Sequence, residues 1–284
     1  MARIGVVGSV NLDMIATAPR LPKPGETVTD ATFAIHPGGK GANQALAARR
    51  LGAEVSLIAR VGTDSNSGPA LELLRRDGVD LDRAYRDREH PTGVALIVVD
   101  EAGENQITVA PGANRHLEPA DLDLSGFDAV VAQLEVPIDT VMTAATTAAE
   151  SLFVLNAAPV RTLPADLIGA CDVIIVNEGE HAALADVLTG ADAIVVTTLG
   201  PRGARAQRGS EEIGHASAPT VNAIDTVGAG DAFTAALTVA LCEGREISDA
   251  LAWACGAGAL TATRRGAQPA LPTRTELDDF MANL

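Results

Sequence analysis

Short apolar runs and helical patterns alternate along most of this chain, and that alternation limits the folds open to it. The runs are RIGVVGS, VSLIARVG, DAVVAQL, SLFVLNA, DVIIVN and AIVVTTLG, with helical segments such as GANQALAARRLG between them. Strands so rich in Val, Ile and Leu are typical of a parallel sheet buried on both faces. The alternation therefore predicts an α/β fold, with helices on both faces of a mostly parallel sheet and ligands beyond the strands' carboxyl ends.

Two stretches interrupt this rhythm. ETVTDATFAI (26–35) and GVALIVVDEAGENQITVAPG (93–112) carry strand-type residues without an intervening helix, and DEAGEN is typical of a hairpin turn. We expect a small antiparallel flap outside the main sheet, able to cover a site; an extra sheet edge without that role is the alternative. The C-terminal part, residues 229–284, is predicted to be mostly helical.

Charge and composition exclude some function classes. A formal charge of −16 argues against nucleic-acid or anionic-membrane partners, because both reward a basic surface. ATP is not excluded, because backbone N–H groups, one or two cations and a metal bind a triphosphate inside an acidic protein. Three dispersed cysteines without a CxxC pair, a strand-like N-terminus and no apolar run of about 20 residues favour a cytoplasmic protein.

The segment DTVGAGD (225–231) is the strongest functional signal. Its bare turn opens an apolar helix, where unpaired backbone N–H groups attract anions. Gly228, Ala229 and Gly230 are suited to present those groups to a phosphoryl group in transfer, and Asp231 to accept the proton of the attacking hydroxyl. Phe233 stands where a dinucleotide-binding motif would have its third glycine, so that pattern is not met.

Two N-terminal segments suit a polyol. In GSVNLD, Asn11 and Asp13 point to the same side at what we expect to be the carboxyl end of the first strand, and a carboxylate accepts two hydroxyl hydrogen bonds. HPGGKGANQA (36–45) fails the Walker A pattern, but it is a glycine run that opens a helix beside Lys40 and Asn43. Ordinary turns are the alternative for both segments.

Two later segments suit a nucleotide. In NEGE, Asn177 is expected to end a strand and Glu180 to lie in the next helix's first turn, which fits a hydrated Mg²⁺ or simply the usual preference for acids there. In TTLGPRG (197–203), Thr198, Gly200 and Gly203 are placed to hold phosphates and sugar, with Arg202 adding charge. A plain β-turn is equally compatible with these residues.

These motifs, in this order, resemble the ribokinase branch of the ribokinase-like carbohydrate kinases. The similarity runs through GSVNLD, PGETVT, GGKGANQA, TGVALI, GEN, PGAN, QLE, NEGE, TLGPRG, DTVGAGD and RRGAQPALP, which together extend over nearly the whole chain. The resemblance implies one kinase domain over 1–284, a three-layer α/β/α sandwich, with lid strands within about 14–36 and 93–112 that often build a homodimer. It implies ATP-dependent phosphorylation of D-ribose at the 5-hydroxyl, giving ribose 5-phosphate and ADP.

The resemblance also assigns residues to roles. For catalysis it implies Asp231 as the base, with Gly228, Ala229 and Gly230 as the anion hole. The implied sugar contacts are Asn11, Asp13, Gly39, Lys40, Asn43, Glu135 and Asp231. The implied nucleotide contacts are Asn177, Thr198, Leu199, Gly200, Pro201, Arg202, Gly203, Gly230 and Cys255. Glu180 belongs to the hydrated Mg²⁺ site, and a K⁺ site matches the Asp225 side chain with the carbonyls of Val227, Thr261, Arg264 and Gly266.

Three departures from the family pattern stand out. Ala270 replaces a serine whose hydroxyl is one ligand of the monovalent cation, which predicts weakened or altered K⁺ dependence. The crossover HAALADVLTGADAIVV (181–196) is short, where relatives usually carry a further helix, so a thinner flank is expected there. Cys255 replaces a frequent polar residue in the helix that borders the adenine pocket, with looser base selectivity as the expected effect.

Other functions remain open at this stage. One alternative is a kinase for another pentose, such as deoxyribose, or for a nucleoside; a single Tyr85 and a single Trp253 argue against a base-stacking acceptor site. Another alternative is a sugar-binding regulator without catalysis, against which the intact GAGD and its aspartate count.

Overall fold

The computed structural model describes residues 1–148 and 150–284, and within them a nine-stranded sheet forms the centre of the main body. Its order is β13-β12-β11-β10-β9-β8-β1-β4-β5, parallel except where β12 joins β11 and β13. The strands are β1 (Arg3–Val7), β4 (Glu54–Gly62), β5 (Ala84–Asp87), β8 (Ala129–Gln133), β9 (Leu152–Asn156), β10 (Val173–Asn177), β11 (Ile194–Thr198), β12 (Ala204–Arg208) and β13 (Glu211–Ala216). The predicted mostly parallel sheet is confirmed.

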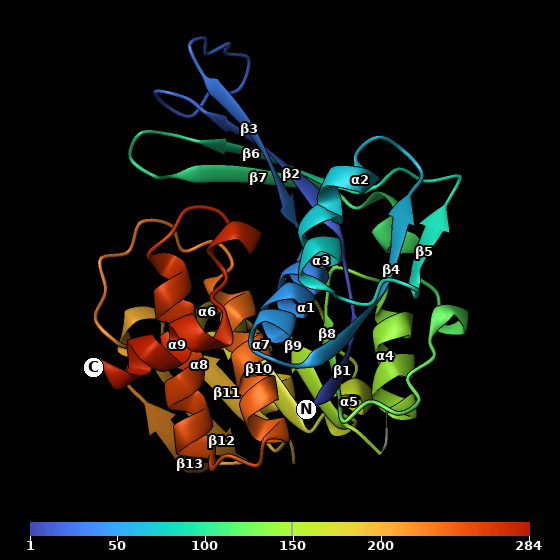
Figure 1. Cartoon of the computed structure of the whole chain (residues 1–284), viewed down its shortest axis with the longest axis vertical. Helices are drawn as coiled ribbons and strands as arrows, with labels where there is room; N and C mark the ends of the chain where they lie inside the picture. Colours follow the sequence, from blue (N-terminus) through green and yellow to red (C-terminus); the bar gives the residue numbers. More distant parts are fainter. Residues whose placement is uncertain (149) are drawn as a thin grey trace.

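Helices cover both faces of this sheet, which gives the three-layer sandwich (Figure 1). One layer holds α1 (Lys40–Arg50), α7 (Ala229–Cys242), α8 (Ile247–Ala262) and α9 (Arg274–Ala282), with α2 (Ser67–Ala70) and α3 (Glu72–Asp77) beside them. The other holds α4 (Ile138–Thr147), α5 (Ala165–Gly169) and α6 (Glu178–Leu188).

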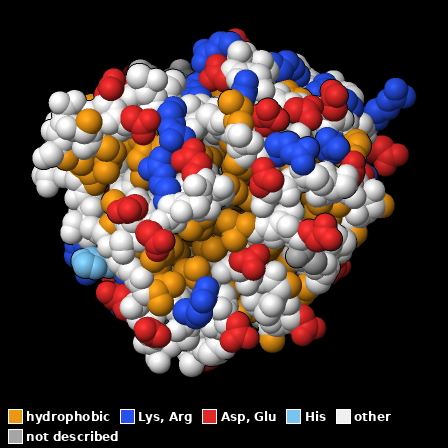
Figure 2. Space-filling view, turned by 60° about the horizontal axis from the view of Figure 1, so that its bottom comes forward, with side chains coloured by type: hydrophobic (Ala, Val, Ile, Leu, Met, Phe, Trp, Pro, Cys, Tyr) orange, Lys and Arg blue, Asp and Glu red, His pale blue; other side chains and the backbone are white. Residues whose placement is uncertain are grey.

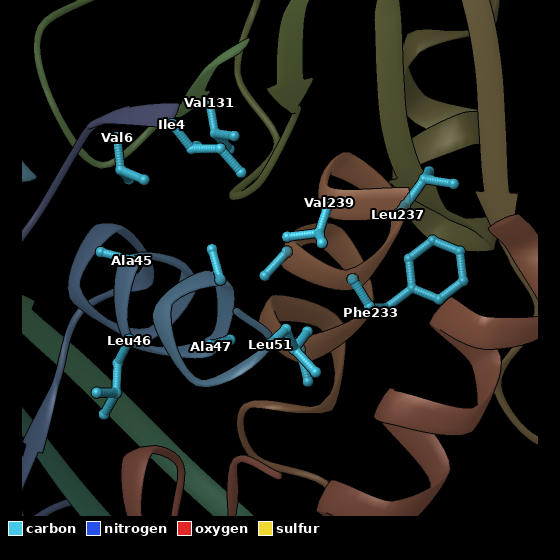
Figure 3. Close-up of a cluster of buried hydrophobic side chains, with 14 of the residues drawn as sticks. Ile4, Val6, Ala45, Leu46, Ala47, Leu51, Val131, Phe233, Leu237 and Val239 are labelled. Carbon is cyan, nitrogen blue, oxygen red and sulfur yellow. The ribbon is translucent and has the colours of Figure 1, made fainter. Parts of the chain in front are cut away.

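The cores between these layers consist almost entirely of aliphatic side chains. Figure 3 shows Leu46 of α1 and Leu51, which directly follows α1, in one cluster with Ile4 of β1 and with Leu237 and Val239 of α7. The alanines of α1 and α7 let the two helices pack closely, and this brings the polar residues at their N-terminal ends together.

A second, four-stranded sheet projects from the body as a lid (Figure 1). Its order is β3-β2-β6-β7, formed by β2 (Asn11–Thr17), β3 (Thr32–Gly38), β6 (Gly93–Val99) and β7 (Asn105–Ala110). The outer pairings are antiparallel, as expected for a flap, but β2 and β6 pair in parallel. Both of these strands lead out of the main body toward the lid's tip, so they run in the same direction.

Several local predictions need correction. The first main strand ends at Val7, so Asn11 and Asp13 begin the first lid strand instead of ending the main one. The segment NSGPALELLRRDG (66–78) has the pattern of a single helix, but it forms two short ones, α2 and α3. The hairpin of β12 and β13 was not predicted, because its strands alternate with charged and polar residues and have no long apolar run.

The short crossover is present as the sequence suggested, since only α6 and a five-residue loop connect β10 to β11. That flank is nevertheless closed: Val195 and Thr197 of β11 are buried, and His181 of α6 reaches Thr197 Oγ1 with its Nδ1 at 2.7 Å. Burial, followed by the charge of Arg205, lowers the pKa of His181. One helix therefore covers the strand.

On the face turned away from the lid, apolar side chains gather in a hollow among scattered acidic ones (Figure 2). At the amino ends of the parallel strands, a cavity of about 700 Å³ is lined by residues that include Leu152, Ile194, Leu241 and Cys242. In the part of the chain that the structure describes, no helix combines the length and the apolar character needed to cross a membrane.

Candidate active site

The N-terminal ends of α1 and α7 meet at Asp231, which is buried. Asn43 donates its Nδ2–H to Oδ2 of Asp231 at 2.8 Å, and Gln44 donates its Nε2–H to Oδ1 at 2.9 Å. Burial raises the pKa of Asp231, while the charge of Lys40 and the two amide hydrogen bonds oppose that rise. The carboxylate is thus removed from water but held by three groups that favour its charged form.

The turn before α7 has the backbone geometry of an anion site. Gly228 is the N-cap with φ +81°, and a Cβ there would lie 3.0 Å from Cα of Ala267, so only glycine fits. The N–H group of Ala229 donates to Thr226 O at 3.2 Å, whereas the N–H groups of Gly228 and Gly230 have no acceptor within residues 1–148 and 150–284. A Cβ at Gly230 would meet no atom within 4 Å, which leaves room for a ligand.

Asn11 is held at the base of the lid by Asn114, which donates its Nδ2–H to Asn11 Oδ1 at 2.8 Å. Asn114 also accepts from Val10 N–H and donates to Val10 O, at 2.8 and 3.0 Å. The space for these amides exists because Gly93 has no side chain: a Cβ there would lie 2.2 Å from Asn11 Oδ1. The Asn11 side chain is therefore fixed before any ligand arrives.

Asp13 lies two residues further along β2 and on the same sheet face. Its carboxylate lies over Gly38, where a Cβ would come within 2.2 Å of Oδ2. Burial and then the charges of Glu135 and Asp231 raise the pKa of Asp13 to about 7. The Asp13 carboxylate accepts no hydrogen bond from the described residues, and the hydroxyl groups of a polyol would supply the missing donors.

Lys40 and Glu135 complete a cluster of charged residues that also contains Asp13 and Asp231. Glu135 Oε2 accepts from Ser9 Oγ at 2.5 Å and from the backbone N–H of Lys40 at 3.1 Å. Burial alone would lower the pKa of Lys40, but the charges of Asp231, Glu135 and Glu180 outweigh burial and raise it. A cation surrounded by three acids stays protonated, as phosphate binding requires.

The predicted nucleotide residues lie at the adjacent strand ends. Asn177 caps α6 and forms a capping box with Glu180: Asn177 Oδ1 accepts from Glu180 N–H and Glu180 Oε2 accepts from Asn177 N–H, both at 2.8 Å. The helix-capping role is thus real, and the charge of Glu180 is also one of the three that raise the pKa of Lys40.

The TTLGPRG segment folds into a tight turn and the short 3₁₀ helix Gly200–Arg202. Leu199 N–H donates to Gly203 O at 2.7 Å, and Arg202 pairs with Glu178, so its charge is engaged locally. Cys255 is buried near Ala216 of β13, and burial raises the pKa of its thiol to about 12. Their roles toward a nucleotide stay predictions.

Asp225 joins the two segments of the predicted cation site. Its Oδ1 accepts from Val227 N–H at 3.0 Å and its Oδ2 accepts from Gly266 N–H at 2.8 Å. Thr261 is fully buried and donates its hydroxyl to Ala257 O, and Ala270 is fully buried as well. Among the described residues, no three His, Cys, Asp or Glu side chains converge to hold a metal ion.

Sequence reasoning did not identify several polar residues that connect this site. They are Ser9, Gln44, Asn114, Gln133 and Asn156. Four of them stand inside motifs already quoted, GSVNLD, GGKGANQA, PGAN and QLE, where a polar residue next to an apolar strand or inside a helix start was a usable signal.

Comparison with known proteins gives one consistent picture. A family model described as pfkB family carbohydrate kinase matches residues 1–274. The ribokinase of Bacillus subtilis (strain 168) is 37% identical over 295 residues, covering 99% of this chain and 100% of its own. The crystal structure of a ribokinase from Thermotoga maritima gives a TM-score of 0.91 at 30% identity, with 100% of both chains covered. The structure of Arabidopsis thaliana ribokinase complexed with ribose and ATP gives 0.88 at 30% identity, covering 99% of this chain and 98% of that one.

Proposed function

This chain belongs to the pfkB family of carbohydrate kinases, and from that premise we propose that it is a ribokinase. It transfers the γ-phosphoryl group of ATP to the 5-hydroxyl of D-ribose and releases ribose 5-phosphate and ADP. One observation carries the proposal: a buried carboxylate, Asp231, lies at the start of α7 next to the N–H groups of Gly228 and Gly230, which have no acceptor among the described residues.

The geometry supports a direct in-line transfer. Asp231 accepts the proton of the 5-hydroxyl as that oxygen attacks, while the N–H groups of the turn stabilise charge on the migrating phosphoryl group. Lys40 adds a positive charge at the same place, close enough to the base to be influenced by it. Asn11, Asp13 and Glu135 bind the remaining hydroxyls of the sugar.

Glu180 and Asp225 carry the proposed binding of Mg²⁺ and K⁺. Oε1 of Glu180 accepts no hydrogen bond from the described residues, and the charge of this carboxylate raises the pKa of Lys40. A carboxylate with a free oxygen suits a water-bridged Mg²⁺ that neutralises the phosphates. Asp225 ties the segment of Val227 to that of Gly266, which gathers carbonyls for K⁺. Ala270 offers no side-chain hydroxyl where the family pattern has a serine, so K⁺ activation is weakened.

The positions of the two large aromatic side chains disfavour a nucleoside acceptor. Trp253 is packed between Arg245 and Arg274, 4.4 and 4.9 Å from its ring, and donates to Asp278. Tyr85 lies on the edge strand β5 and donates to Asp121 O. Neither belongs to the elements that carry Asn11 and Asp13. The buried base at a phosphate-binding turn likewise disfavours a non-catalytic regulator.

A second copy of the chain is proposed to cover the lid. Phe33, Ile35 and Leu96 lie on one face of this sheet according to its register and are about half exposed or more, at 65%, 47% and 51%. Apolar patches of this kind mark interaction surfaces.

Three free thiols fit a reducing compartment, and we place the enzyme in the cytoplasm.

The function is tested by coupled ADP release against pentoses, hexoses and nucleosides, with and without K⁺. We expect D-ribose to give the highest kcat/KM and 2-deoxyribose to follow it. ADP release that no sugar stimulates would refute the kinase assignment, and a preference for a nucleoside or for deoxyribose would replace ribose as the substrate.

A further inference from the structure

A chain of buried amides leads from the central sheet to Asp231. Gln133 of β8 donates its Nε2–H to Gln44 Oε1 at 2.6 Å. Gln44 of α1 uses its own Nε2 twice, toward Asp231 Oδ1 at 2.9 Å and Asn156 Oδ1 at 3.0 Å. Asn156 of β9 in turn donates its Nδ2–H to Ile175 O at 3.4 Å. Gln44 and Gln133 are 1% and 0% exposed, so solvent does not compete for these hydrogen bonds.

The orientation of each side-chain amide in this hydrogen-bonded series is fixed by the groups at its two ends, the Asp231 carboxylate and the Ile175 carbonyl. An ionised carboxylate only accepts, so Gln44 must turn its NH₂ group toward Asp231. A main-chain carbonyl also only accepts, so Asn156 must turn its NH₂ group toward Ile175 and its oxygen toward Gln44. Gln44 Oε1 is then left as an acceptor, and Gln133 must donate to it. With a charged Asp231, these orientations satisfy every hydrogen bond of the series at once.

Two buried amide oxygens around Asp231 have no partner among the described residues, Oδ1 of Asn43 and Oε1 of Gln133. Oε1 of Gln133 lies against Gly8, where a Cβ would come within 2.1 Å. An unpaired buried carbonyl costs stability, and an apolar side chain of similar size would avoid that cost. The glutamine at 133 is therefore explained by its donor, which serves Gln44, and not by the stability of the fold.

We propose that Gln44 is a positioning residue for the catalytic base: its amide holds Oδ1 of Asp231, keeps the carboxylate ionised and aimed, and is itself oriented by Gln133. Asn43 binds the other oxygen, Oδ2, and is also an expected sugar contact, so the acceptor hydroxyl approaches on the Oδ2 side. Each carboxylate oxygen offers two acceptor directions, so Oδ2 has room for both Asn43 and the hydroxyl. This inference rests on the proposed function.

The test uses Gln44→Met and Gln133→Met, which keep the side-chain length and remove the amide. Losing a donor to a charged group raises the pKa of Asp231, so the acidic limb of the kcat profile at saturating ribose, where the bound sugar keeps Asp13 ionised, moves up by about one pH unit or more in Gln44→Met. A smaller shift in the same direction is expected for Gln133→Met, because Asn156 still orients Gln44. The KM for ATP stays unchanged. Gln207→Met, on β12, is the matched control and keeps the wild-type profile.

A second measurement reads the same carboxylate without turnover. Protein labelled with ¹³C at the aspartate carboxyl carbons is titrated by NMR, and the Asp231 signal is assigned by its loss in Asp231→Asn. An upward shift of this titration in Gln44→Met supports the inference even if the wild type phosphorylates no sugar, a result that would refute only the proposed function. Superimposable titrations for folded wild type, Gln44→Met and Gln133→Met overturn the inference, whatever the activity.

Discussion

Replacing Asp13 by asparagine should stabilise the ligand-free protein, and increasingly so as the pH rises. The pKa of Asp13 is raised from 3.8 to about 7 in the folded state, so between these values the folded protein binds more protons than the unfolded chain. By linkage, the wild type then loses stability as the pH increases through this window. The asparagine of Asp13→Asn does not titrate, so the variant does not lose this stability as the pH rises.

The size of the effect follows from the two pKa values. Between pH 5 and pH 8, folded and unfolded pKa values of about 7 and 3.8 correspond to roughly 2–3 kcal/mol of lost stability. Partial contact of Asp13 with solvent weakens its interactions, so we expect about 2 kcal/mol. Burial is the main cause of the raised pKa, and Glu135 and Asp231 remain in place in the variant, so the gain comes from removing the buried charge of Asp13.

The measurement is urea unfolding of both proteins at pH 5, 6, 7 and 8. The difference in unfolding free energy between variant and wild type should grow across this series, while Asp279→Asn on the exposed surface of α9 should show no such growth. Ribose should bind to the wild type with release of protons near pH 6–7, because its hydroxyls stabilise the carboxylate, and should bind poorly to Asp13→Asn. Parallel stability–pH curves for wild type and Asp13→Asn would refute the reasoning.

Three further outcomes are expected. Asp231→Asn should lower kcat by about 10² or more with ribose binding largely kept, as steady-state kinetics and calorimetry will show; unchanged turnover would remove Asp231 as the base. Ala270→Ser should increase the activation by K⁺, and identical activation curves for the two proteins would contradict the link between Ala270 and the cation. Phe33→Lys on the lid should shift light-scattering mass from dimer to monomer, and a monomeric wild type would exclude the lid dimer.

The sequence carried most of the fold because its signals were local and repeated. RIGVVGS and DVIIVN have the composition of buried strands. The glycine turn before Asp231 indicated a helix start from neighbouring residues alone. Motif order then identified the family, which the comparisons confirm. Failures fell where the local signal was weak, such as the polar hairpin of β12 and β13.

The sequence by itself determined which residue types are present and where strands, helices and glycine turns form, since these depend on neighbours a few positions away. Only the tertiary structure decided which residues meet. Gln44 and Asp231 are 187 positions apart and Gln133 stands on a third element, so their hydrogen bonds depend on the packing of α1 against α7 over β8. Burial, neighbouring charges and the hydrogen bonds of Asn43 and Gln44 to Asp231 are also properties of that packing, and together they set the proton affinity of Asp13 and Asp231.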